Sequence, residues 1–439
     1  MASAASVCEK EDCIVRVVHV SMGTSGGGGR IALLLHQSLR KLGVDSHMVV
    51  LESSSVVDPF VHRPQGFVQR LIARYLRNID KLPNKLYRQK LNTAWSNNWA
   101  PVYTARQVHA LLPDIVHLHV IGAGVFPIHD VSLLKAPIVW TMHDMMAFTG
   151  GCHYSGGCER FRECCGSCPE LGSKNAHDLS GRNWRKKEAK WRSQPMAIVS
   201  PSHWMGSLSR SSGLLGGKEN VVIHNGIDLE CFHPHDPISA REALGLPKDK
   251  KLIGFGASLL QDPRKGLRYL KDALESPVLH FAESDCEVVT FGHGSAGEQM
   301  AGMRSHNFGS ISDDRQLALL YSALDVFCVP SIEENLATTA IESLACGTPV
   351  VAFGIGGFPD IVEHLKCGFL AEPFEPRSLA AGLQWTLNAN HPSDGLNSMR
   401  EAARNRAELA FDSRVVARKH LDLYQILLDE ASTQRRLNA

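Results

Sequence analysis

Residues 334–342 have the sequence ENLATTAIE and lie between two apolar runs, LDVFCV (324–329) and TPVVAF (348–353). Each run is short and rich in β-branched or aromatic residues, which is typical of a strand buried on both faces of a parallel sheet. Strong helix formers follow the threonines, and Gly347 marks the end of the predicted helix. The stretch therefore predicts a strand, a helix that begins near Thr338 and a second strand, which is the repeating unit of a doubly wound α/β domain.

The same alternation of apolar runs and helical segments extends along the chain in two series. The first series contains IVRVVHV (14–20), SHMVVL (46–51), IVHLHV (115–120), APIVWT (136–141), MAIVSPS (196–202) and NVVIHN (220–225). The second contains KLIGFG (251–256), CEVVTF (286–291) and the two runs that flank ENLATTAIE. A polar stretch with prolines, residues 225–237, separates them. Because 439 residues exceed what one core normally supports, we expect two Rossmann-like domains with a cleft between them, residues 1–230 and 231–410.

Composition and charge narrow the class of protein. Lysine and arginine number 46 against 45 acidic residues, so no global field favours nucleic acid as a partner. The first 13 residues, MASAASVCEKEDC, lack the basic and apolar regions of a secretory signal. No apolar run approaches the roughly 18 residues that cross a bilayer. We therefore expect a cytoplasmic protein whose 12 cysteines are thiols or metal ligands.

The helix predicted from Thr338 offers an anion site. Its first backbone N–H groups and the positive end of its dipole suit a diphosphate, and the hydroxyls of Thr338 and Thr339 can donate as well. Glu342 lies about one turn inside the helix, where it can accept hydrogen bonds from a ribose diol, and Glu334 can reach the hydroxyls of a sugar beyond the phosphates. The alternative is that both glutamates only solvate the start of a helix.

Longer motifs support the first interpretation. The stretch ENLATTAIESLACGTPVVAFGIGGFPDIV resembles the E-x7-E region of glycosyltransferase family 4, whose members are retaining sugar-nucleotide transferases with the GT-B fold. Further motifs follow in the family's order: Gly26-Gly27 after the first strand, TMHDMM with His143, SPSHWM, HNGID (224–228) and DPRKG (262–266). The resemblance covers residues 14 to 430 and implies that a last helix, about 411–430, packs back on the first domain.

The resemblance also implies roles for single residues at the donor. Lys265 corresponds to the lysine that neutralises the departing diphosphate. The family usually has an arginine close after the glycine of this strand, but GASLL (256–260) lacks it, so we assign its role to Arg264. His143 corresponds to the histidine that faces the donor sugar, Glu334 to the residue that orients this sugar and Glu342 to the ribose ligand. The remaining residues that the resemblance places at the nucleotide sugar are Gly26, Gly27, Gly292, Asn335, Leu336, Thr338 and Thr339.

These roles imply transfer of a sugar from a nucleoside diphosphate sugar to a saccharide or lipid-linked saccharide, with retention at the anomeric carbon. No Asp-x-Asp motif occurs, so we expect charge neutralisation by Lys265, Arg264 and the helix start, with no cofactor needed for catalysis. Two alternatives stay open: a nucleotide-sugar epimerase or NAD-dependent oxidoreductase, and a catalytically silent sugar-nucleotide-binding protein. GHGSAG (292–297) matches the dinucleotide fingerprint but lies in the second strand series instead of the first βα unit.

Four cysteines follow His143 closely: Cys152, Cys158, Cys165 and Cys168. Four thiolates at this density can enclose a tetrahedral zinc, although their spacing is not that of a zinc ribbon. The surrounding segment, TMHDMMAFTGGCHYSGGCERF, resembles a subgroup of the family found in bacterial surface-polysaccharide assembly, of the colanic acid or O-antigen type. We expect either a structural zinc or free or disulfide-linked thiols that shape the acceptor side.

A basic segment lies between Arg63 and Lys90, with eight lysines and arginines and one acidic residue, Asp80. Four apolar residues recur in it at intervals of four: Phe67, Leu71, Tyr75 and Ile79. This pattern predicts an amphipathic helix that either rests on an anionic membrane surface or packs its apolar stripe on the domain core. The first option predicts peripheral contact with the inner face of a membrane.

Overall fold

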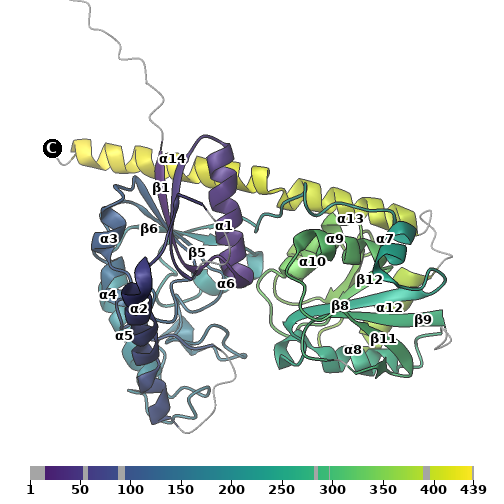
Figure 1. Cartoon of the computed structure of the whole chain (residues 1–439). Coiled ribbons are helices and arrows are strands. Elements are labelled where there is room, and N and C mark those ends of the chain that lie inside the picture. The colour runs from purple at the N-terminus through teal and green to yellow at the C-terminus, as the bar shows by residue number, and fades with distance from the viewer. Residues whose placement is uncertain are drawn as a thin grey trace, which may run out of the picture.

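The computed structural model of the protein describes residues 15–52, 58–87, 94–280, 285–295, 297–388 and 396–437. They form two α/β units side by side, each built on a seven-stranded sheet (Figure 1). The prediction of two doubly wound parallel-sheet units is confirmed. The amino-terminal segment 1–13 and the last three residues of the basic segment, 88–90, lie outside the described residues.

The first sheet has the strand order β3-β2-β1-β4-β5-β6-β7, and every neighbouring pair is parallel. Its strands are β1 (Arg16–Gly23), β2 (Asp45–Glu52), β3 (Val61–His62), β4 (Ile115–Leu118), β5 (Ile138–Thr141), β6 (Met196–Ser200) and β7 (Glu219–Val222). Its helices are α1 (Gly26–Lys41), α2 (Gly66–Asp80), α3 (Ala105–His109), α4 (Ile128–Val131), α5 (Leu179–Trp191) and α6 (His203–Arg210), with 3-10 turns η1 (Leu82–Leu86) and η2 (Arg160–Arg162).

The second sheet has the order β10-β11-β9-β8-β12-β13-β14 and is parallel except for the β10–β11 pair. Its strands are β8 (Lys251–Leu259), β9 (Cys286–His293), β10 (Gln299–Met300), β11 (Met303–Asn307), β12 (Val326–Val329), β13 (Val350–Phe353) and β14 (Gly368–Ala371). Its helices are α7 (Pro237–Leu244), α8 (Leu267–Leu274), α9 (Asp314–Ala323), α10 (Thr338–Ala345), α11 (Phe358–Ile361), α12 (Pro376–Leu387) and α13 (Leu396–Phe411), with the 3-10 turn η3 (Pro263–Lys265).

The stretch around ENLATTAIE folds as its sequence predicts. Strand β12 leads through a loop into α10, which begins at Thr338, and β13 follows and pairs with β12 in parallel. Gly347 has the left-handed φ of +74° that ends the helix without a steric penalty. Four strands were not predicted, namely β3, β10, β11 and β14. They lie at or next to a sheet edge and are short or polar, so they lack the apolar run that identifies a central strand.

A long carboxy-terminal helix, α14 (Ser413–Leu437), runs from the second unit back along the first (Figure 1). Val416, Ala417 and Tyr424 are buried in one cluster with Val17 of β1 and Leu39 of α1. The helix therefore buries its apolar side against the unit that begins the chain.

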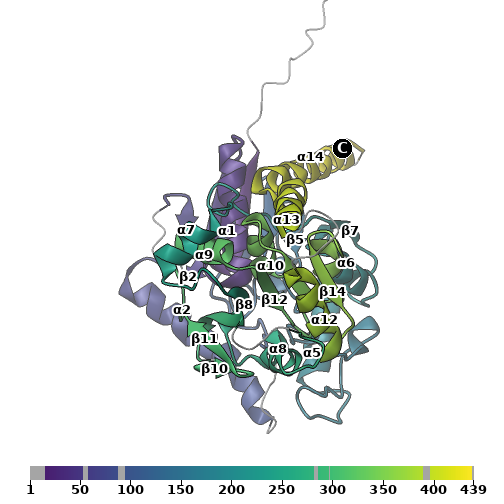
Figure 2. The ribbon, with the colours of Figure 1, turned by 90° about the vertical axis from the view of Figure 1, so that its right-hand side faces the viewer.

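Helix α2 lies along the outside of the first unit, at the front in Figure 1 and at the left edge in Figure 2. Its apolar stripe is exposed: Phe67 is 75% exposed, Leu71 55% and Tyr75 65%. The alternative prediction, that this stripe packs on the domain core, is therefore wrong. Periodicity defines the apolar face of a helix but does not say whether a neighbour covers that face.

The end of α2 is nevertheless held firmly. Asp80 is buried and accepts hydrogen bonds from four successive backbone N–H groups, those of residues 97–100, at 2.7–3.3 Å. These four donors satisfy the buried carboxylate and tie it to the backbone of residues 97–100. The exposed apolar stripe thus belongs to a helix that is anchored at its carboxyl end.

Candidate functional site

The carboxyl edges of the two parallel sheets meet, and one amide joins them. Asn335, in the loop between β12 and α10, donates through Nδ2 to the carbonyl oxygens of Met142 (2.9 Å) and His143 (3.1 Å). Its Oδ1 accepts from Ser202 Oγ at 2.8 Å. All three bonds cross from one unit to the other. This loop therefore lies in the cleft between the units, where ligands of such sheets bind.

Glu334 and Lys265 form an ion pair in this cleft. Lys265 Nζ donates to Glu334 Oε2 at 2.5 Å, and Glu334 is 8% exposed. The two loops are also tied through the backbone, since Ile332 N donates to the carbonyl of Arg264 at 2.8 Å. Gly266 has φ +75° and lies so close to Pro330 that a Cβ would meet its carbonyl oxygen at 1.8 Å. The close approach that glycine permits sets the lysine beside the glutamate.

Arg264 reaches across to the first unit instead of pairing with Glu334. Its guanidinium bonds to Asp262 at 2.8 Å and stacks over the ring of Tyr154, with Cζ 4.8 Å from the centroid. The arginine and the lysine of DPRKG thus take different partners, one across the cleft and one within the second unit. Both place a cation in the same loop.

Glu342 is buried in α10 and has two partners. Tyr321 Oη donates to its Oε2 at 2.9 Å, and Arg30 of α1 lies 3.8 Å from its Oε1. Burial raises the pKa of this carboxyl, whereas the nearby arginine lowers it. Arg30 also bonds to Asp314 of α9 at 2.7 Å. A cation from the first unit therefore faces the carboxylate predicted to hold the ribose.

The glycine run of residues 26–29 forms the first turn of α1. Its N-cap residue, Ser25, makes no side-chain cap hydrogen bond, and the turn contains no acidic residue. A Cβ on Gly26 or Gly27 would meet nothing within 4 Å, whereas a Cβ on Gly28 would lie 2.5 Å from Val120 Cγ2 and 3.1 Å from His143 Cγ. Gly26 and Gly27 therefore leave open space at a helix start, and Gly28 lets the helix pack on the histidine.

His143 follows β5 and is held from behind. Its Nε2 lies 3.0 Å from Nδ1 of His119. Burial lowers the pKa of His143 to about 4, so the imidazole is neutral at physiological pH. Asp144, its neighbour in sequence, bonds to His153 Nδ1 at 2.7 Å instead. The hydrogen-bond partner of His143 is therefore another histidine and not the aspartate beside it in sequence.

The remaining predicted residues surround this loop region. Gly292 is the second-last residue of β9 and has φ +132°, and a Cβ there would meet the Ala257 carbonyl oxygen at 1.8 Å. Thr338 and Thr339 open α10, which has no side-chain cap. Leu336 is buried in the core of the second unit. Only its backbone can therefore reach a ligand.

The four cysteines line one cavity together with Trp95 and Phe161. Burial raises the pKa of the Cys152 and Cys165 thiols, the latter to about 12. Among the described residues, no three of these sulfurs lie as close together as a metal site requires, and all four are free thiols. The zinc site stays a prediction. Three buried histidines, His19, His117 and His119, do have the spacing of a metal site.

Sequence reasoning missed several residues that the structure brings to the cleft. Arg30, Tyr154, Tyr321 and His119 contact predicted site residues, and Asp314 contacts Arg30. Arg30 offered one signal, because it directly follows the glycine run and thus lies in the first turns of the predicted helix. The others lie within ordinary strands, helices and loops, where nothing in the sequence distinguishes them.

Two family models match the chain. The model described as "Glycosyltransferase Family 4" matches residues 25–231, and the model described as "Glycosyl transferases group 1" matches residues 250–389. Together with the two facing parallel sheets, they define a glycosyltransferase of the GT-B type. The chain belongs to glycosyltransferase family 4 and carries a group 1 glycosyl transferase domain in its second half. The predicted family and fold are confirmed.

Relatives and solved structures agree with this assignment. The D-inositol 3-phosphate glycosyltransferase of Mycolicibacterium gilvum (strain PYR-GCK) is 26% identical over 403 residues, which are 87% of this chain and 82% of that protein. The enzyme of the same name from Mycobacterium marinum is 29% identical over 196 residues, 44% of this chain and 42% of that protein. The chain thus aligns with less than half the length of this second relative.

Two solved structures share the fold over almost the whole chain. Sucrose-phosphate synthase from Thermosynechococcus elongatus superimposes with a TM-score of 0.63 at 17% identity and covers 95% of this chain and 100% of its own. Anabaena HepE in complex with UDP superimposes with a TM-score of 0.61 at 18% identity, covering 94% and 99%. At such identities the likeness establishes the fold alone.

The packing of α1 on His143 gives a test of this geometry. We expect Gly28→Ala to destabilise the protein by about 1–3 kcal/mol, because the new methyl group overlaps Val120 and His143. Gly27→Ala, which meets open space, should instead stabilise it by about 0.5–1 kcal/mol through helix propensity. The melting temperatures of both variants, measured by thermal unfolding, test this expectation. Equal melting temperatures would contradict the packing of Gly28 on Val120 and His143.

Proposed function

We propose that this protein transfers a sugar from a nucleoside diphosphate sugar to a saccharide hydroxyl, with retention at the anomeric carbon. The observation that carries the proposal is the Lys265–Glu334 pair at the open start of α10. It places a cation for the diphosphate beside a carboxylate for the sugar. The proposal also divides the chain near residue 230. The first domain binds the acceptor, and the second binds the nucleotide sugar.

The diphosphate is bound by cations and helix starts in this proposal. Lys265 has three donors and can keep Glu334 while it bonds a phosphate oxygen. Arg264 adds a second cation, and the uncapped first turns of α1 and α10 add backbone N–H groups. Such donors stabilise the charge that develops on the leaving diphosphate without reorganising. Charge neutralisation of this kind needs no divalent metal.

The sugar end of the donor lies between the two units. The carboxylate of Glu334 accepts from sugar hydroxyls and orients the ring, and neutral His143 faces the same sugar from the first unit. The acceptor hydroxyl attacks the face that the diphosphate leaves, and a phosphate oxygen accepts its proton. His143 and Glu334 are the catalytic residues of this step, together with Lys265.

The nucleoside end is bound by Glu342. Its carboxylate lies buried between Tyr321 and Arg30 and accepts hydrogen bonds from the ribose diol. Gly292, where a Cβ would meet the Ala257 carbonyl oxygen, lets the backbone approach the nucleoside closely. Uridine nucleotides are the first donors to test, because Anabaena HepE is described in complexes with UDP and UDP-glucose.

Replacement of Glu342 tests the donor site. Glu342→Ala should weaken nucleoside diphosphate binding about 10- to 100-fold, because it removes hydrogen bonds to a charged group. The matched control is Asp314→Ala, which removes the other carboxylate partner of Arg30 and should leave affinity within about twofold. Isothermal titration with UDP, GDP, ADP and NAD measures both. Binding of NAD alone, or an unchanged affinity in Glu342→Ala, contradicts the proposal.

We also propose that α2 docks the enzyme on an anionic lipid surface, where a lipid-linked acceptor in polysaccharide biosynthesis is found. Seven apolar side chains between residues 67 and 86 are at least half exposed: Phe67, Val68, Leu71, Ile72, Tyr75, Leu82 and Leu86. Exposed cations flank them, namely Arg70, Arg74, Lys81 and Lys85. An apolar stripe with a basic border is typical of helices that lie in the headgroup region. In the part of the chain that is described, no helix is long and apolar enough to cross a bilayer.

Vesicle sedimentation tests the docking helix. The protein should sediment with vesicles that contain phosphatidylglycerol and much less with pure phosphatidylcholine, since both apolar insertion and charge contribute. The double variant Leu71→Ser, Phe67→Ser should reduce the bound fraction at least fivefold. It removes two inserted side chains, and burial of apolar surface contributes about 25 cal/mol per Å² to binding. The control is Leu409→Ser, an exposed leucine of α13 in the second unit. Equal loss in the control, or no sedimentation of the wild type, contradicts docking by α2.

A further inference from the structure

Three histidines from neighbouring strands form a buried hydrogen-bonded chain behind the cleft. His19 lies in β1, His119 directly follows β4 and His143 follows β5, and these three strands are adjacent in the sheet. Nδ1 of His19 lies 2.9 Å from Nε2 of His119, and Nδ1 of His119 lies 3.0 Å from Nε2 of His143. We propose that His119 and His19 are positioning residues that keep the proton of His143 on Nδ1, so that this nitrogen donates into the cleft.

The direction of the chain follows from its inner end. A neutral imidazole has one N–H donor and one acceptor nitrogen, so the three rings can be ordered in only two ways. Nε2 of His19 is fully buried and has no hydrogen-bond partner within the described part of the chain. A buried N–H without an acceptor is rarer than a buried acceptor without a donor. His19 therefore donates from Nδ1 to His119, and His119 donates from Nδ1 to Nε2 of His143.

The outer end of the chain is then a donor. Nδ1 of His143 has no partner within the described ranges, and it is bonded to Cγ, the atom that lies against Gly28 of α1. The N–H thus lies beside the first turn of α1, whose backbone N–H groups are uncapped. If the proposed function holds, this edge of the cleft presents donors only. It therefore binds an oxygen of the donor sugar or its phosphate that can accept a hydrogen bond.

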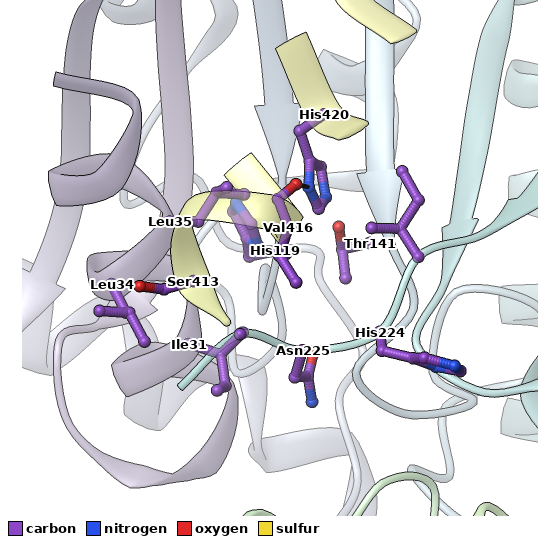
Figure 3. A pocket seen from close by; sticks show the side chains of 12 residues that line it. Ile31, Leu34, Leu35, His119, Thr141, His224, Asn225, Ser413, Val416 and His420 are labelled. Atoms are coloured by element: carbon purple, nitrogen blue, oxygen red, sulfur yellow. Dashed lines mark hydrogen bonds between the residues drawn. The ribbon is translucent and has the colours of Figure 1, made fainter. Parts of the chain in front are cut away.

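The neighbouring histidines do not compete for the nitrogen atoms of the histidine chain. His117 stacks on His119 with centroids 4.1 Å apart, but its two nitrogens bond to Tyr424 Oη (2.6 Å) and Thr141 Oγ1 (2.8 Å). His420 of α14 lies above the same small cavity that His119 lines, and its Nδ1 donates to the Val416 carbonyl at 2.9 Å (Figure 3).

On the side of α1, His36 meets His19 edge to face, with centroids 6.0 Å apart. Its Nδ1 lies 2.7 Å from Ser46 Oγ and its Nε2 lies 3.5 Å from Asp58. Asp144, the acidic residue next to His143, bonds to His153. Burial lowers the pKa of all three chain histidines, so protonation does not break the chain near neutral pH.

A metal ion is the other use of buried histidines at this spacing. It does not suit the contacts, because both nitrogens of His117 already bond to hydroxyl groups. The rings of His19 and His119 are also stacked, with an interplanar angle of 28°, and joined by a direct hydrogen bond. Lone pairs that bind one ion must converge on a point, and hydrogen-bonded rings do not leave that point open.

Nitrogen-15 NMR of histidine-labelled full-length protein at pH 7 tests the proposal directly. We expect the one-bond proton coupling of His143 on Nδ1, with Nε2 unprotonated, and the same tautomer in His119 and His19. His143 protonated on Nε2 in the wild type overturns the proposal. Stoichiometric zinc in the purified protein, lost in His117→Gln, would overturn it as well. Neither measurement depends on sugar transfer, so their failure is distinguishable from failure of the proposed function.

Two variants separate positioning from structure. His119→Phe should shift the His143 proton towards Nε2 and lower kcat about tenfold, with donor affinity unchanged, because a single hydrogen bond at the sugar is lost. His119→Asn keeps an N–H donor near the position of Nδ1 and should restore both the tautomer and most of kcat. An unchanged His143 tautomer in His119→Phe overturns the proposal. If that variant does not fold, the wild-type tautomer decides alone.

Discussion

The amide of Asn335 is the contact on which the site depends. Its three hydrogen bonds join the loop before α10 to the backbone after β5 and to Ser202 at the start of α6. Asn335 lies between Glu334 and the open start of α10, so its hydrogen bonds position both of them. A buried amide that uses its donors and its acceptor is costly to displace. The distance between His143 on one unit and Glu334 on the other is set by this residue.

Opposite charges in the cleft are paired before any ligand arrives. Lys265 holds Glu334, and Arg30 lies between Asp314 and Glu342. Pairing keeps each buried or half-buried charge from paying the full cost of leaving water. A nucleoside diphosphate sugar would offer its anion to the cations and its hydroxyls to the carboxylates, so the pairs open to a ligand that satisfies both members. This explains how charged residues are tolerated in a closed cleft.

The sequence predicted what depends on local pattern. The strand, helix and strand around ENLATTAIE were correct because apolar runs and helix formers act over a few residues. The resemblance implied that Lys265 and Glu334 both serve the donor, but their ion pair was not predicted, because 69 positions separate the two residues. The histidine chain could not be seen, because the order β1-β4-β5 brings together residues that are far apart in sequence. Exposure of the α2 stripe was equally hidden, since buried and exposed apolar faces have the same period.

The most direct measurement is donor turnover followed by proton NMR of the anomeric hydrogen. The purified protein is incubated with α-linked UDP-, GDP- and ADP-sugars and a panel of saccharide and inositol phosphate acceptors. Release of one nucleoside diphosphate, an α-configured first product and loss of turnover in Lys265→Ala are the predicted results. A β-configured first product contradicts retention. If the protein binds the donors but turns over none of them, the proposed sugar transfer is contradicted, and a catalytically silent binding protein is favoured.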